Sequence, residues 1–319
     1  MSPTDQDPVR TLLSDAVSDV EPAYGLDRIR SRTAGRPRRT WAWGGAAVAT
    51  AATIAAVVAL GGLPGTTEAG SENGPAARTG AAATGTVRSV YFVGDTGLGP
   101  RLFTEQHRTS AQWPLDETVA AAVSGAATDP DYRSPWPRGA RMERAQVSDG
   151  VLSVDLSGPV RDRPAGLSEA TAATAVQQLV WTAQDAAGSD LPVTFLLDGR
   201  PADTLLGEPT DRPVARASAD DVLAPVQITA PADGSTVTSP VTVTGVASAF
   251  EGNVQWELMD GASVVKRGFA TAEECCTLSP YTFTVSAPAG EYTLVVHDED
   301  VSGGEGNPES SDTKAITVR

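Results

Sequence analysis

The hydrophobic and polar pattern of the middle region predicts a domain of strands and helices. Its clearest helix covers residues 168–188, where Ser168 is a suitable N-cap and Gly188 a suitable terminating residue. The buried stripe of this helix recurs at helical spacing and comprises Val176, Leu179, Val180 and Ala183. A second helix is predicted at 115–127, and strands at 87–93, 102–108, within a hairpin at 140–156, and at 191–199. This order of elements predicts an α/β or α+β fold over residues 87–217, with helices covering a sheet.

The pattern changes at residue 225, after which helical periodicity is absent. Short apolar stretches alternate with Pro, Gly and Asp turns. Seven strands are predicted, at 226–230, 241–247, 254–260, 263–268, 281–287, 291–298 and 314–319. This spacing indicates an immunoglobulin-like β-sandwich over residues 225–319, with Trp256 as its candidate core aromatic.

Residues 41–63 form an uncharged apolar segment without Pro. As a helix, this segment would span roughly 34 Å, enough for a hydrocarbon core of about 30 Å. The basic residues before it are Arg28, Arg30, Arg32, Arg36, Arg38 and Arg39. We therefore predict a single transmembrane helix with a cytoplasmic N-terminus and extracytoplasmic domains. A cleaved signal peptide is the alternative, but its basic region would be about 40 residues long and no A-x-A site follows.

The remaining segments connect these parts. Residues 1–40 are a polar cytoplasmic tail with one amphipathic stretch at 7–20, which is either a solvated helix or a docking helix for a cytoplasmic partner. Residues 64–86 are rich in Ala, Gly, Thr and Ser and predict a flexible linker. Residues 218–224 form a second, short linker between the two domains.

Charge and residue content exclude several classes of function. The formal net charge is −16, so nucleic acid, which requires Lys and Arg to neutralise its phosphates, is not an expected partner. The two histidines, His107 and His297, lie in different predicted domains. We expect no cofactor-binding, metal or catalytic residues.

Three groups of residues are candidate sites with a structural alternative. Asp155 and Asp198 follow apolar strands, where acids are either catalytic or turn residues, and Ser153 and Ser157 have no His nearby in the sequence. The acidic segment 297–312 offers oxygen ligands for calcium or is a solvated loop. Aromatic residues in a Pro-rich stretch either grip a glycan or peptide or pack over the sheet; they are Trp113, Tyr132 and Trp136.

The two cysteines, Cys275 and Cys276, are adjacent. Outside the cell thiols tend to oxidise. Neighbouring Cα atoms are about 3.8 Å apart, closer than most disulfides prefer. A vicinal disulfide, an intermolecular bridge and free thiols all stay open.

Both predicted domains contain familiar motifs. The first resembles the sporulation and spore germination domain GerMN in the segments SVYFVGDTGLGP, VSDGVLSVDLSG, VQQLVWTAQ and VTFLLDGRP. The second resembles the immunoglobulin-like domain of bacterial spore germination proteins in ITAPADGSTVTSPVTVTGVASAFEGNVQWELMDG and GEYTLVVHDED. The resemblance covers about residues 87–319 and implies envelope modules, often found behind an anchor, without a catalytic motif.

We therefore predict a non-enzymatic, membrane-anchored binding or scaffold protein of the bacterial envelope. Its expected partners are the membrane, through residues 41–63, and envelope proteins or further copies of the chain. One alternative is a signalling protein whose tail binds a cytoplasmic regulator. A second alternative is a cell-wall hydrolase or its accessory, which would need a metal or paired carboxylates.

Overall fold

The computed structural model describes residues 85–125, 127–298 and 309–319, which belong to one compact unit. The predicted tail 1–40, transmembrane helix 41–63 and residues 64–84 of the predicted linker lie outside the described residues. Within the described ranges, none of the helices has the length and apolar character needed to cross a membrane.

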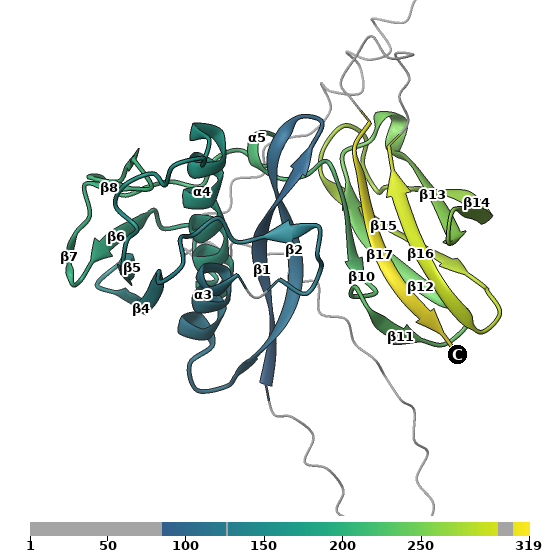
Figure 1. Cartoon of the computed structure of the whole chain (residues 1–319), viewed down its shortest axis with the longest axis horizontal. Helices are drawn as coiled ribbons and strands as arrows, with labels where there is room; N and C mark the ends of the chain where they lie inside the picture. The colour runs from purple at the N-terminus through teal and green to yellow at the C-terminus, as the bar shows by residue number, and fades with distance from the viewer. Residues whose placement is uncertain (1–84, 126, 299–308) are drawn as a thin grey trace, which may run out of the picture. The chain divides into compact units, whose positions relative to one another are not determined.

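The first domain consists of two small sheets with helices between them (Figure 1). One sheet has the order β2-β1-β3, with the strands β1 (Gly85–Thr96), β2 (Gly99–Ser110) and β3 (Tyr132–Arg133). The other has the order β4-β5-β6-β7, with the strands β4 (Arg141–Ser148), β5 (Val151–Ser157), β6 (Val193–Leu197) and β7 (Arg200–Pro201). The remaining elements are α3 (Pro114–Ser124), α4 (Glu169–Ala187), α5 (Ala219–Val222) and a ribbon of β8 (Thr204–Leu205) and β9 (Glu208–Pro209).

The helix α4 begins and ends as its sequence predicts. The Ser168 hydroxyl accepts a hydrogen bond from the backbone N–H of Thr171 at 3.0 Å. Gly188 adopts a left-handed conformation with φ of 61°. Because α4 connects β5 to the parallel strand β6, it supplies the crossover that parallel pairing requires.

The prediction of a single sheet in this domain is wrong, and the surface of α4 explains why. Its predicted stripe is buried in a core that contains residues of both sheets, among them Phe92 of β1 and Leu156 of β5. Trp181, outside that stripe, packs with Tyr91 and Val93 of β1. A helix that is buried on more than one side can carry a sheet on each. The long β1–β2 hairpin, paired over its whole length, therefore forms a separate sheet.

The second domain is a β-sandwich, and every strand predicted for it is present. Its smaller sheet has the order β10-β12-β15, with the strands β10 (Val226–Ala230), β12 (Val241–Ala247) and β15 (Ser279–Val285). Its larger sheet has the order β11-β17-β16-β13-β14, with the strands β11 (Ser235–Val237), β13 (Asn253–Asp260), β14 (Ser263–Thr271), β16 (Gly290–His297) and β17 (Ser311–Val318). The short strand β11 was not predicted; it pairs in parallel with β17.

Each domain has its own main apolar core, and a smaller apolar cluster around Trp181 lies beside the first. The first core runs from Val90 to Ala224 and the second from Val226 to Val318. In the second core, Tyr281 is the buried aromatic residue, at 3% exposure. Trp256 is half-buried and packs against this core from β13, where its ring stacks on Phe283 at a centroid distance of 4.9 Å. Trp256 is therefore a peripheral rather than a central core residue.

Candidate binding surface

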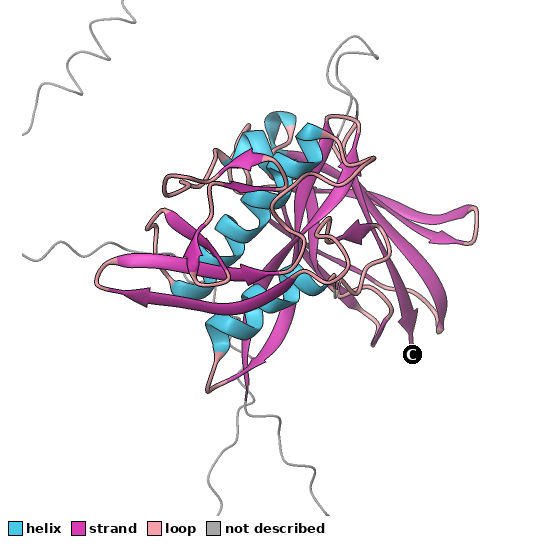
Figure 2. Ribbon diagram, turned by 60° about the vertical axis from the view of Figure 1, so that its left-hand side comes forward, coloured by secondary structure: helices cyan, strands magenta, loops and turns pink. Residues whose placement is uncertain are grey.

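The strand β14 ends the larger sheet of the sandwich, and its outer side pairs with no strand among the described residues (Figure 2). Three of its apolar side chains are exposed, Val264 at 43%, Val265 at 47% and Phe269 at 73%. Two basic residues, Lys266 and Arg267, lie between them and are also exposed. We call these five residues of β14 the edge surface.

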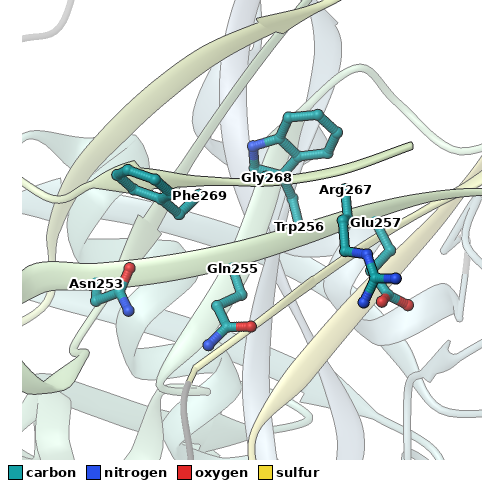
Figure 3. A pocket seen from close by; sticks show the side chains of 7 residues that line it. All are labelled: Asn253, Gln255, Trp256, Glu257, Arg267, Gly268 and Phe269. Carbon is teal, nitrogen blue, oxygen red and sulfur yellow. The ribbon is translucent and has the colours of Figure 1, made fainter.

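The register between β13 and β14 determines which side chains are neighbours on the outer face of the sheet. Gln255 lies opposite Phe269, and Glu257 lies opposite Arg267. Because alternate residues of a strand point to the same side, these four side chains share one face. Figure 3 shows them around a shallow cavity of about 360 Å³. An aromatic ring, an amide and a pair of opposite charges therefore stand together on an open sheet.

Gly268 allows this strand to lie close to the aromatic layer behind it. A Cβ atom at this position would be 2.5 Å from Cζ2 of Trp256. Trp256 projects to the other side of the sheet from Gln255 (Figure 3). Because Gly268 has no side chain, the indole ring of Trp256 packs beneath the edge surface. The ring supports β14 from the inner side of the sheet.

A buried group of charged residues lies where the two domains meet. We call Asp129, Tyr132, Asp312 and Lys314 the junction cluster. The Lys314 ammonium donates to Asp129, to the Tyr132 hydroxyl at 2.6 Å and to Asp312 at 3.3 Å. The Tyr132 hydroxyl donates to Asp312 at 2.6 Å. Lys314 is 3% exposed, so these interactions take place away from solvent.

Burial dominates the electrostatics of the junction cluster. It raises the pKa of Asp129 above its usual value, although the hydrogen bond from Lys314 acts in the opposite direction. Burial likewise raises the pKa of the Asp312 carboxyl, against the opposing charge of Lys314. Both shifts follow from the cost of ionising a carboxyl away from water. Two carboxylates share one ammonium here, and burial makes both of them harder to ionise than in water.

Further hydrogen bonds join the domains around this cluster. The backbone N–H of Thr104 donates to the Gln227 side chain at 3.0 Å. The Thr313 hydroxyl donates to Asp131 at 2.8 Å. Glu105 accepts hydrogen bonds from the backbone N–H groups of residues 128 and 129, and it contacts His107 at 2.8 Å. These groups hold the loop before β3 against β2 and the sandwich.

Two family models match the chain in these two domains. A model described as "Sporulation and spore germination" matches residues 89–203. A model described as "Immunoglobulin-like domain of bacterial spore germination" matches residues 225–305. The chain carries both spore germination domains. The resemblance drawn from the sequence is confirmed, and we refer to them as the GerMN domain and the immunoglobulin-like domain.

Several solved structures, two of them of GerMN domains, are similar at low sequence identity. The tandem GerMN domains of the sporulation protein GerM from Bacillus subtilis are 13% identical, with 63% of this chain and 61% of that chain covered and a TM-score of 0.33. The first GerMN domain of the same protein is 14% identical, with 41% and 98% covered and a TM-score of 0.32. A putative lipoprotein from Clostridium perfringens is 14% identical, with 42% and 90% covered and a TM-score of 0.29.

The match therefore spans about three fifths of the length of the tandem structure. No curated protein matches the sequence.

The acids considered for catalysis in the GerMN domain lie around one turn. The carboxylate of Asp155, on β5, accepts a hydrogen bond from the backbone N–H of Gly199 at 3.0 Å. Asp198 precedes that glycine and has a positive φ of 52° in the turn between β6 and β7. The structure thus brings Asp155 close to the turn that contains Asp198. Ser157 donates to Glu143, and Ser153 lies opposite Gln146 in the hairpin register.

The three aromatic residues of the Pro-rich stretch have different environments. Tyr132 and Trp136 are buried, at 6% and 7% exposure. Trp113, immediately before α3, is 57% exposed. Packing accounts for two of the three, and Trp113 alone of these is available to a ligand.

The cysteines and the acidic segment belong to the immunoglobulin-like domain. The structure joins Cys275 to Cys276, with a Cα–Cα distance of 3.8 Å. The vicinal disulfide stays a prediction. Of the acidic segment 297–312, residues 299–308 lie outside the described part. Elsewhere in the described chain no group of three or more His, Cys, Asp or Glu residues is arranged to hold a metal ion.

The edge surface and the junction cluster were missed by sequence reasoning. The edge strand could have been suspected from SVVKRGF, because two basic residues interrupt an apolar stretch in an acidic chain. The junction cluster has no comparable signal. Asp129 and Lys314 are 185 positions apart, and Lys314 belongs to an ordinary alternating strand.

Proposed function

We propose that the chain is a membrane-anchored envelope protein whose GerMN and immunoglobulin-like domains bind or scaffold other proteins outside the cytoplasm. The family matches support a role related to sporulation or germination. The apolar segment 41–63 and the preceding arginines support the anchor and its orientation. The proposed action is association without catalysis.

The edge surface is the observation that carries this proposal. Soluble domains rarely leave apolar side chains grouped together in solvent unless a partner covers them. Phe269 is more exposed than any other large apolar residue in the described chain. An open strand edge also presents backbone groups that a partner can bind.

The junction cluster supports the scaffold part of the proposal. Buried, hydrogen-bonded charges require a fixed geometry, since separation would leave them unpaired. The cluster therefore holds the immunoglobulin-like domain in one orientation on the GerMN domain. A partner bound at the edge surface would be held in that same orientation.

Crosslinking in intact cells tests the proposal. A photo-crosslinking residue in place of Phe269 should capture specific envelope proteins. The matched control is the same residue in place of Thr236, which is exposed on β11 at the opposite edge of the same sheet. Identical patterns from the two positions, or none from either, would contradict a binding role for the edge surface.

Topology has a separate test. A reporter that is active only in the cytoplasm, fused after Arg319, should be silent. Strong activity would place the two domains in the cytoplasm and remove the anchored, extracytoplasmic part of the proposal.

The amphipathic stretch 7–20 favours a second candidate function, signalling through the tail. Its apolar residues recur at helical spacing, as in a helix that docks on a partner. A pull-down with residues 1–40 alone separates the two functions. Specific retention of a cytoplasmic regulator would support signalling, and no retention would leave the external binding role.

A further inference from the structure

The strand β14 ends in an open edge whose side chains complement a second copy of themselves. Arg267 and Phe269 lie two positions apart on the same face, with Gly268 between them. If two β14 strands pair antiparallel about a twofold axis through Gly268, Arg267 of each copy lies opposite Phe269 of the other. A guanidinium next to an aromatic ring is a favourable cation–π pair.

We propose that two copies of this chain associate through antiparallel pairing of their β14 strands, centred on Gly268. The inference rests on the proposed binding function and names the partner as a second copy. The contact is isologous, because each copy contributes the same strand. It joins two five-stranded sheets into one continuous sheet.

The side chains behind the edge make this pairing electrostatically neutral. Glu257 lies opposite Arg267 and Gln255 opposite Phe269 within each copy. Each row across the joined sheet would then read Glu257, Arg267, Phe269 and Gln255, with the last two from the second copy. The acid of each row compensates its base, so two acidic chains can meet here without an unpaired charge.

Registers centred on the neighbouring residues of β14 are less favourable than the one centred on Gly268. Residues that lie directly opposite each other in a sheet point to the same face. The outer faces of the two copies therefore join into one face only in registers in which the twofold axis passes through a residue, so that this residue lies opposite its own copy. An axis through Arg267 would place two guanidinium groups opposite each other, which is destabilising. An axis through Phe269 would place ring on ring but leave Arg267 opposite Thr271.

The size of the contact implies weak association. One short strand pair buries less than the area of about 1,000 Å² that a stable interface needs. Tethering on a membrane raises the effective concentration to about 1 mM, where a weak contact is populated. We therefore expect reversible dimers, with a fraction that rises with concentration.

Sedimentation equilibrium of the purified full-length chain in density-matched detergent, up to about 1 mM, tests this. The wild type should form dimers. Phe269→Arg should weaken dimerisation about tenfold, because it removes both cation–π pairs and places two guanidinium groups opposite each other in each row. Adding Arg267→Phe to Phe269→Arg should restore dimerisation, since each row then again pairs one aromatic ring with one guanidinium group.

Each substitution is on the exposed side of the edge strand, and melting temperatures within about 3 °C of wild type would show that the fold is retained. A monomer at every concentration, a dimer insensitive to Phe269→Arg, or a double exchange that fails to restore dimers would each overturn the inference. Crosslinking of Phe269 to other envelope proteins in cells, without dimers, would leave the proposed function standing while this inference fails.

Discussion

The junction cluster and the edge surface contain the same kinds of side chain in opposite environments. At the junction, the Lys314 ammonium lies 4.3 Å from the centroid of the Tyr132 ring and contacts two carboxylates. At the edge, Arg267 lies opposite Glu257 and two positions from Phe269. Removal from water makes the first group costly to disturb, whereas solvent screens the second. Burial, rather than residue type, decides which cation stabilises the fold.

Replacing Lys314 by Met is the strongest test of this comparison. It leaves Asp129 and Asp312 buried without a cation and should lower the free energy of unfolding by about 3–5 kcal/mol. Urea unfolding followed by circular dichroism measures this. Lys266→Met at the exposed edge is the matched control, with an expected change below about 0.5 kcal/mol. Similar losses in both variants would show that burial does not separate the two sites.

Tyr132→Phe tests the neutral member of the junction cluster. The change removes the hydroxyl that accepts from Lys314 and donates to Asp312, and should cost about 1–3 kcal/mol of unfolding free energy. Tyr292→Phe is its control, because that hydroxyl bonds to the Pro288 carbonyl at 3.3 Å near the surface. A change within about 0.5 kcal/mol for Tyr132→Phe would mean that the hydroxyl contributes little to the junction.

The pH dependence of stability sharpens the comparison further. The raised pKa of Asp129 means that the folded chain binds this proton more tightly than the unfolded chain does. Its contribution to unfolding free energy therefore increases as the pH falls through the raised pKa toward the usual value of 3.8. Urea unfolding of wild type and Asp129→Asn across this range should show the wild type gaining relative stability on acidification.

Asp95 provides a control of opposite sign. The hydrogen bond from Arg133 lowers the pKa of this exposed carboxyl, so its contribution is present above pH 3.8 and is lost as the pH falls through the lowered pKa. Wild type should therefore lose stability relative to Asp95→Asn on acidification. The same sign for both comparisons would contradict the assigned causes.

The smallest effect on stability is expected at the edge surface. Phe269→Ser removes a side chain that is 73% exposed, so the free energy of unfolding should change by less than about 0.5 kcal/mol. Thermal unfolding measures this. Leu258→Ser on the neighbouring strand β13 is the contrast, because Leu258 is fully buried and its loss should be large. A large loss for Phe269→Ser would show that this ring packs within its own domain.

Local elements were predictable because their signals lie within a few residues. The N-cap Ser168, the terminating Gly188 and the apolar stripe of α4 specify that helix from its own sequence. The hairpin turn at Asp149 and Gly150 connects β4 to β5, as its sequence indicates. Both residues have a positive φ there.

Contacts between residues far apart in the sequence were harder to predict. The first domain divides into two sheets that both pack against α4, and contacts such as that of Trp181 with β1 have no marker in a helical pattern of period 3.6. The parallel pairing of β11 with β17 joins segments about 80 residues apart, and β11 is too short to show a pattern.

By itself, the sequence determined the two spore germination domains, their longer strands and their two long helices, and the apolar segment that predicts an anchor. These follow from periodicity and turn chemistry, which act between neighbouring residues. Only the tertiary structure decided that Lys314 is enclosed with Asp129 and Asp312 while Arg267 and Phe269 remain at an open edge. The physical reason is that solvent exposure depends on which strands end a sheet and which surfaces meet, and no local pattern encodes either.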